Sequence, residues 1–317
     1  MVKISTFFEK YGWSEDQEMG ALKKAVRFIG PALLIFVFIR FVDISLLLKT
    51  FREISLPFLL LSYLSMIALL LGKIFRISVP LSKSSVEIKF YYFLRIFTSS
   101  RLLGWVSNTF ISDVVNAGIL MRKHEQKMRI SSVFILSRAA DILATLILFG
   151  IMFYLNAGLM APYLRLSYQK VVIIFSFVFA ALLLIFFLRT KAMMYIKDFL
   201  SAGKTFLAVT ANLTIFVVIC TILAVILNAK ALHIDVSPSF LLLCYVVGIA
   251  ISVLPISLSG IGTREITFVF LMKLVNVPSE KAIAFSFLEF LFMPLFCLAT
   301  LHLVALIGEH RENMHRR

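Results

Sequence analysis

The chemistry most clearly indicated by residue type and spacing is phosphate binding, in the segment LPISLSGIGTRE at residues 254–265. Pro255 ends one helical stretch, and the two glycines that follow let the backbone turn and approach a partner closely. The next helix should start near Thr263, so that its free N–H groups and positive dipole end lie beside Arg264. The alternative is a tight turn in which Arg264 and Glu265 pair with other helices and have a structural role. The candidate substrate-binding residues of this segment are Ser257, Ser259, Gly260, Gly262, Thr263, Arg264 and Glu265.

Four more ionisable side chains lie within or beside apolar stretches. Arg138 and Asp141 are three residues apart and share one face of a helix, which should turn toward the bundle interior because an unpaired charge in hydrocarbon costs about 3 kcal/mol. Pairing with each other and contact with a substrate both remain open for these two residues. Arg101 is a second candidate phosphate ligand, and Asp113 is placed to position Arg138 or Arg264.

Two single polar residues complete the set of candidates. Asn116 either lines a polar path or forms hydrogen bonds between helices. Glu289 lies inside a long apolar stretch, where it binds a proton, pairs with Arg264, or selects a cationic headgroup. Pairing with a nearby arginine is the expectation for a buried glutamate.

Metal, redox and cofactor chemistry are not expected. The three cysteines, Cys220, Cys244 and Cys297, lie within apolar runs and lack both CxxC spacing and a paired histidine. Gly260 and Gly262 follow no strand, and the third glycine of a dinucleotide-binding turn is absent. We therefore predict no metal and no cofactor.

The composition shows what must position these residues. Of 317 residues, 61% are hydrophobic and 15% are charged, compared with about 25% charged residues in soluble domains, and the mean hydropathy is +0.97. A soluble core cannot enclose so much apolar surface, whereas a bilayer can. The net charge of +15 is explained by cationic loops that meet anionic lipid headgroups, and nucleic acid is not an expected partner.

Hydrophobic stretches of about 20 residues mark the membrane spans. Two longer apolar stretches, 90–121 and 239–277, are interrupted, the first around residues 99–104 and the second around 255–262. The sequence predicts an all-α polytopic membrane protein with about six full transmembrane helices and two oppositely directed re-entrant or broken helical hairpins. The expected full spans are 26–42, 54–72, 130–155, 171–188, 206–229 and 282–307.

The distribution of basic residues gives the orientation. We expect residues 1–25 to form a cytoplasmic interfacial segment, 26–307 the transmembrane domain, and 308–317 a basic cytoplasmic tail, so that both termini are cytoplasmic. The segment 43–53 is then an outer loop. The cytoplasmic clusters are expected to be Lys73, Arg76, Lys83 and Lys89, and then Arg122, Lys123, Lys127 and Arg129.

Several motifs resemble those of one family. The segment PISLSGIGTRE resembles the signature of the lysylphosphatidylglycerol synthase transmembrane, or flippase-like, family, and VPSEKA at 277–282 resembles its following helix connection. DVVN at 113–116 and SRAAD at 137–141 resemble two upstream elements of that family. The resemblance extends over residues 26–307. Departures occur at Ser112, Asn116, Ser137 and Glu289, where the family often has Gly, Arg, Glu and Arg.

The resemblance implies a lipid transporter in the cytoplasmic membrane. Its expected partner is a lipid with an anionic phosphate headgroup, such as an aminoacylated phospholipid or a polyprenyl-linked or glycolipid. The chain ends ten residues after its last expected span, so we expect the membrane domain without the aminoacyl-transfer domain, and no enzyme activity. The alternatives are a membrane-embedded lipid-linked glycosyl- or phospho-transferase and a non-catalytic envelope-assembly subunit. A homo-oligomer and an envelope-synthesis partner are both left open.

Overall fold

The protein is a bundle of helices in the part of the chain that the computed structural model describes, residues 44–83, 88–107, 109–160, 204–253 and 260–314. Every regular element in these ranges is a helix, as the sequence predicts for a membrane protein. Four helical stretches are long and apolar enough to cross a membrane: 56–82, 127–159, 208–231 and 279–312. The expected spans 26–42 and 171–188 and the interfacial segment 1–25 lie outside the described residues.

The first long helix, α4, differs from its expected extent. It runs from Leu56 to Lys83, so that Lys73 and Arg76 lie inside the helix and the assignment of these two residues to a cytoplasmic connection is wrong. The apolar pattern continues past both residues as far as Leu81, and Pro80 is accommodated near the end of the helix. Before it, the expected loop 43–53 contains a short helix instead, α3, at Ile44–Arg52.

Helix α10 (Lys204–Ala231) packs closely along α4. Ser62 and Ser65 of α4 donate hydrogen bonds to carbonyl oxygens of α10, with Ser65 Oγ 2.9 Å from the Cys220 oxygen. A Cβ atom on Gly72 would lie 2.9 Å from the Val217 side chain. Small residues therefore allow the two backbones to approach, which is how helices associate in a membrane.

Residues 90–121 form a helical hairpin of α5 (Phe90–Ser107) and α6 (Thr109–Lys123). The interruption expected at 99–104 is misplaced, since α5 continues through Ser100 and Arg101. The two arms pack against each other, and Lys123 Nζ lies 4.2 Å from the centre of the Tyr92 ring. Both basic ends of the hairpin therefore lie at the same end of the bundle, as expected.

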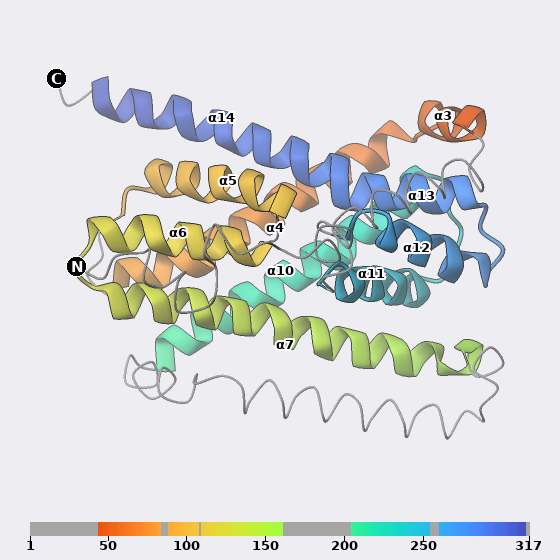
Figure 1. Ribbon diagram of the computed structural model, residues 1–317, viewed down its shortest axis with the longest axis horizontal. Coiled ribbons are helices and arrows are strands. Elements are labelled where there is room, and N and C mark those ends of the chain that lie inside the picture. Colours follow the sequence, from red (N-terminus) through yellow and green to blue (C-terminus); the bar gives the residue numbers. More distant parts are fainter. Residues whose placement is uncertain (1–43, 84–87, 108, 161–203, 254–259, 315–317) are drawn as a thin grey trace, which may run out of the picture.

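The second hairpin consists of α11 (Pro238–Val253) and α12 (Thr263–Lys273), and its break falls where proline and glycine predict it. Gly260 has φ of +79°, and a Cβ atom there would lie 2.7 Å from the Ser252 Cα atom, so the turn requires a residue without a side chain. Figure 1 shows the two hairpins entering the bundle from opposite ends of its long axis, with the ends of α5 and α11 and the starts of α6 and α12 toward the middle.

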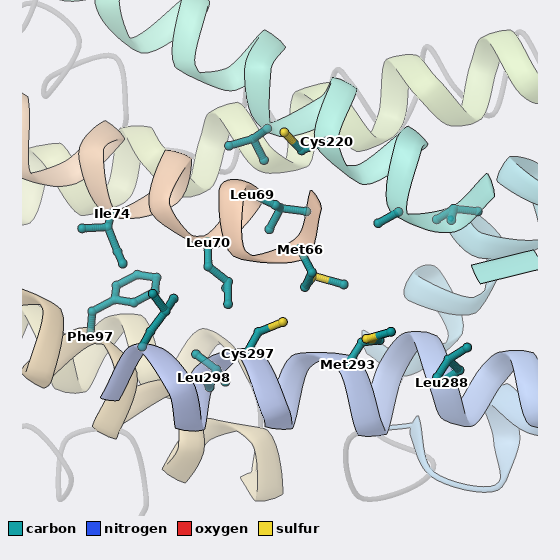
Figure 2. Packing of buried hydrophobic residues seen from close by; sticks show 14 of the residues in the cluster. Met66, Leu69, Leu70, Ile74, Phe97, Cys220, Leu288, Met293, Cys297 and Leu298 are labelled. Carbon is teal, nitrogen blue, oxygen red and sulfur yellow. The ribbon is translucent and has the colours of Figure 1, made fainter. Parts of the chain in front are cut away.

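Residues 279–314 form one long helical run. Helix α13 (Ser279–Phe287) continues into a π-helical turn, η2 (Leu288–Phe292), and then into α14 (Met293–Met314). Figure 2 shows Met66 and Leu70 of α4 pointing toward Cys297 and Leu298 of α14. The apolar core is continuous between these helices, and the three cysteines are free and buried in it, as expected.

Helix α7 (Lys127–Met160) lies on the opposite side of α4 and α10 from α14 and packs against α11 and α6. The bundle thus encloses two regions where charged side chains meet. One lies between α4, α5, α6 and α7, and the other lies at the start of α12.

Candidate functional site: two buried charged groups

The predicted phosphate-binding turn forms a closed ion pair at its helix start. Arg264 Nη2 lies 2.7 Å and Nε 3.1 Å from Oε1 of the adjacent Glu265. Ser286 Oγ of α13 donates to the same oxygen over 3.0 Å. The other carboxylate oxygen, Oε2, accepts the N–H of Gly262 over 2.7 Å, which caps the helix with its own third residue.

Arg264 is therefore enclosed by protein side chains and does not face an open site. Its guanidinium lies 4.3 Å from the centre of the Phe290 ring, and the residue is 6% exposed. Thr263 Oγ1 donates to the Gly260 oxygen, so the hydroxyl also serves the turn. The contacts of Arg264 and Glu265 are those of a structural pair, as in the alternative interpretation. Within the described residues, however, the two side chains form an ion pair with each other, and the bond to another helix comes from the Ser286 hydroxyl. Ser257 and Ser259 lie outside the described residues.

The second group begins with Arg76 and Asp141, which join α4 to α7. Arg76 Nη2 lies 2.8 Å from Asp141 Oδ1, and the side chains are 1% and 21% exposed. Arg76 Nε donates to Ser137 Oγ over 3.0 Å, and Nη1 donates to Thr214 Oγ1 over 3.3 Å. Asp141 is thus paired across helices and not with Arg138 on its own face.

Arg101, Asp113 and Arg138 continue the same group on α5, α6 and α7. Arg101 Nη2 lies 2.6 Å from Asp113 Oδ1, and Arg138 Nη1 lies 3.8 Å from Asp113 Oδ2. Asp113 therefore pairs with Arg138, one of the two partners expected for it, and in the described part of the chain it forms no ion pair with Arg264. Asn116 Oδ1 accepts a hydrogen bond from Ser100 Oγ over 2.5 Å, which links α6 to α5.

Lys73 adds a further cation. It lies one turn before Arg76 on α4, and its ammonium group interacts electrostatically with Asp141, Arg101, Arg76 and Arg138. Among the described residues we find no hydrogen bond and no ion pair within 4.0 Å for Lys73. We refer to the polar cluster as Lys73, Arg76, Arg101, Asp113, Asn116, Arg138 and Asp141.

The polar cluster has an excess of positive charge. Its four cationic and two acidic side chains leave a formal charge of +2. It lies inside the bundle, because Arg76 is seven residues from the end of α4 and Arg138 is eleven residues from the start of α7, which correspond to about 10 and 16 Å along the helices. An excess charge buried that far inside the bundle costs free energy unless an anion or water interacts with it.

Two buried N–H donors of the polar cluster also lack an acceptor. Arg101 Nε and Asn116 Nδ2 are enclosed without a hydrogen-bond partner in the described structure. Unsatisfied buried donors are rare in proteins and often mark a site for a ligand or water. With Lys73, they give the polar cluster the donor set that binds phosphate oxygens. No group of residues suited to a metal ion is found in the described ranges.

Glu289 belongs to neither charged group. It lies buried in η2 and accepts a hydrogen bond from Asn228 of α10, so the expectation that it pairs with Arg264 is wrong. The reason is that Arg264 forms its ion pair with Glu265, the next residue in the chain.

The sequence interpretation missed Lys73, Arg76 and Asn228. An expected span that ends at the first charge places Lys73 and Arg76 in a connection, although the apolar residues Ile74, Ile77 and Leu81 continue at helical spacing. That periodicity was the signal that could have found them. Asn228 lies in an expected span, but nothing in its neighbourhood indicates that its partner is 61 residues away.

Comparison with known proteins agrees with the fold. No curated protein matches the chain. The family model described as the lysylphosphatidylglycerol synthase TM region matches residues 24–300, which is most of the chain and includes both charged groups. A multi-pass membrane protein with a lipid-related function follows from this match and from the apolar helices. The chain therefore belongs to the lysylphosphatidylglycerol synthase transmembrane-region family.

Proposed function

We propose that this protein is a flippase-like transporter that moves a phosphate-containing lipid across the cytoplasmic membrane. The single observation that supports this proposal best is the excess positive charge of the polar cluster inside a membrane-embedded bundle. An anionic headgroup would neutralise that charge, while the acyl chains stay in the bilayer. An aminoacylated phospholipid and a polyprenyl-linked or glycolipid both have the required phosphate.

In this proposal the headgroup binds at Lys73, Arg101 and Arg138. Arg76 positions the group, because Asp141, Ser137 and Thr214 engage three of its nitrogen atoms. The Arg264–Glu265 pair stabilises the second hairpin and does not contact the phosphate.

Both hairpins are proposed to be re-entrant, with their turns near the middle of the membrane. Broken helices of this kind provide a polar path that a lipid headgroup can follow. The ends of α4 and α14 that carry Lys83 and Arg311 are proposed to be cytoplasmic, as basic residues favour. The proposed activity is transport without chemical change of the lipid.

A transport assay tests the site. The full chain is reconstituted in liposomes that contain a fluorescent phosphatidylglycerol, and a membrane-impermeant reductant added outside measures how fast inner-leaflet lipid becomes accessible. Lys73→Gln and Arg101→Gln each remove one charged donor, and a charged hydrogen bond contributes about 1.5–3 kcal/mol, so we expect the rate at limiting lipid to fall about tenfold or more. Lys273→Gln is the matched control, since Lys273 is an exposed residue at the end of α12.

The outcome distinguishes the alternatives. A folded Lys73→Gln/Arg101→Gln protein that transports at the wild-type rate would refute the polar cluster as the headgroup site. A probe with the same chains and an uncharged headgroup should be transported slowly by wild type and be insensitive to both substitutions. Turnover of a nucleotide-sugar or lipid donor by the purified protein would instead identify a transferase.

A further inference from the structure

Glu289 is a buried carboxyl group without a cation. It is 2% exposed, and no Lys, Arg or His nitrogen of the described residues lies within 4.0 Å of its oxygens. Among the described residues its one hydrogen bond comes from Asn228 Nδ2, which lies 2.5 Å from Oε2. Glu265, one helix away, has a guanidinium, a hydroxyl and a backbone N–H as partners. The surroundings of Glu289 are therefore not those of a stabilised carboxylate.

The amide of Asn228 has an unfilled acceptor beside this carboxyl group. Asn228 is fully buried, and its Oδ1 has no hydrogen-bond donor among the described residues. A protonated Glu289 supplies the missing donor: its O–H can donate to Oδ1 while Nδ2–H donates to the other carboxyl oxygen. An acid and an amide joined in this way satisfy each other with two hydrogen bonds, whereas a carboxylate leaves Oδ1 without a partner.

None of the described groups on the surrounding helices supplies a positive charge that would neutralise a Glu289 carboxylate in place of a proton. From α11, Tyr245 interacts with it electrostatically and stacks on Phe290, with ring centres 5.4 Å apart. From α12, Arg264 and Glu265 are engaged with each other. The remaining charged residues of the helices that pack here are directed elsewhere. Among those whose side chains the structure describes, they are Lys230 of α10 over the Phe58 ring, Lys273 at the exposed end of α12, Lys281 of α13 on the His233 oxygen, Glu280 at the start of α13, Lys49 and Arg52 of the exposed part of α3, and Glu309, Arg311 and Glu312 at the far end of α14.

The backbone at Glu289 is also unusual. Residues 288–292 form the π-helical turn η2, in which hydrogen bonds span five residues and one residue is inserted into the helix. Such turns are frequent at functional sites and interrupt the regular ladder of the helix. A titratable side chain on this turn lies where the helix can rearrange without unwinding.

We propose that Glu289 is the proton-binding site of the transporter and couples lipid movement to the proton gradient, an inference that rests on the proposed function. In the conformation described here the carboxyl group is protonated and bound to Asn228. When η2 rearranges and water reaches the group, the O–H bond breaks, its electron pair stays on the carboxyl oxygen and the proton passes to water. The resulting carboxylate must take up a proton again before it returns to the apolar interior.

Infrared spectroscopy tests the proton directly. In purified wild-type protein at neutral pH we expect a carbonyl stretch of a protonated carboxylic acid that is absent from Glu289→Gln and present in Glu309→Gln. Glu309 is the matched control because it lies on the same helical run and is paired with Arg95 over 3.1 Å. Should Glu289→Gln fail to fold, Asn228→Leu is measured instead, and its band must shift because the hydrogen bond to Oδ1 is lost. A spectrum without the band, or a band unchanged in both variants, overturns the proposal.

Transport under a pH gradient tests the coupling. With one proton per lipid, the steady-state distribution of lipid between leaflets should change about tenfold per pH unit in wild type. Glu289→Gln should equilibrate lipid without responding to the gradient. Wild-type transport that ignores the gradient overturns the coupling and leaves the transporter role intact. If wild type moves no lipid at all, the proposed function fails, and the infrared result alone decides whether Glu289 binds a proton.

Discussion

The substitution Asp141→Asn gives the sharpest test of how the polar cluster is held together. It keeps the size of the side chain and an oxygen that can accept from Arg76, but it removes the charge that faces a guanidinium only 1% exposed. Removal of one partner of a buried ion pair costs about 3–5 kcal/mol. Because Asp141 is 21% exposed and Arg76 keeps Ser137 and Thr214, we expect the lower end, about 3 kcal/mol, or a factor of about 150 in the unfolding equilibrium.

The assay is unfolding by SDS in mixed micelles, followed by tryptophan fluorescence, with a double-mutant cycle on the pair. Arg76→Met/Asp141→Leu removes both charges, and its free energy of unfolding should lie within about 1 kcal/mol of wild type, because an apolar pair often replaces a buried ion pair without loss. Asp141→Asn also raises the formal charge of the polar cluster to +3, so anionic lipid added to the micelles should stabilise this variant more than wild type. A single variant that costs less than about 1 kcal/mol, or a cycle that is simply additive, would refute the reasoning.

Two further predictions concern the packing around the site. Gly308→Ala should lower the free energy of unfolding by about 1–3 kcal/mol, because a Cβ atom there would lie 2.3 Å from the Tyr91 ring. Gly158→Ala is the control: a Cβ atom there meets nothing within 4 Å, so the free energy of unfolding should stay unchanged or rise by up to about 1 kcal/mol. Thermal unfolding of the two variants in one detergent compares them, and equal loss in both would contradict the contact. Ser286→Ala removes a 3.0 Å hydrogen bond to the Glu265 carboxylate and should lower the free energy of unfolding by about 1.5–3 kcal/mol in the same measurement. Ser286→Thr should retain most of the stability. An alanine variant as stable as wild type would show that the hydroxyl does not stabilise the fold.

The second hairpin is the part of the fold that could be predicted most closely from the sequence. Proline and closely spaced glycines interrupt an apolar stretch, and helix α12 begins at Thr263 as that pattern predicts. The first hairpin was expected from the distribution of basic residues, but its turn was placed too early. Ser100 and Arg101 are polar and looked like a break, whereas both lie inside α5, where Ser100 bonds to the opposite arm and Arg101 to Asp113.

The partners of the charged residues could not be predicted, because they depend on which helices meet and at what height. Arg76 pairs with Asp141 across 65 positions of sequence, whereas local spacing leaves open whether Asp141 pairs with Arg138 or contacts a substrate. Arg264 shows the opposite case. Adjacent residues on a helix do not normally face each other, yet the long guanidinium folds back onto Glu265 at the first turn, where the helix has only begun.

The π-helical turn has a consequence for the rotational phase of the last helix. Each residue of an α-helix advances by about 100°, so the one residue inserted in η2 turns the following stripe of Met293, Cys297 and Leu301 toward the core. If the insertion moves by one position along the chain, the residues that it passes rotate by the same angle while the helix on either side stays in place. Such a shift carries Glu289 away from Asn228 and brings a neighbouring side chain into its position. A deletion of one residue in this turn would therefore give a regular α-helix in which the residues of α14 keep their contacts with α4 and α5, while the shift of Glu289 would no longer be possible.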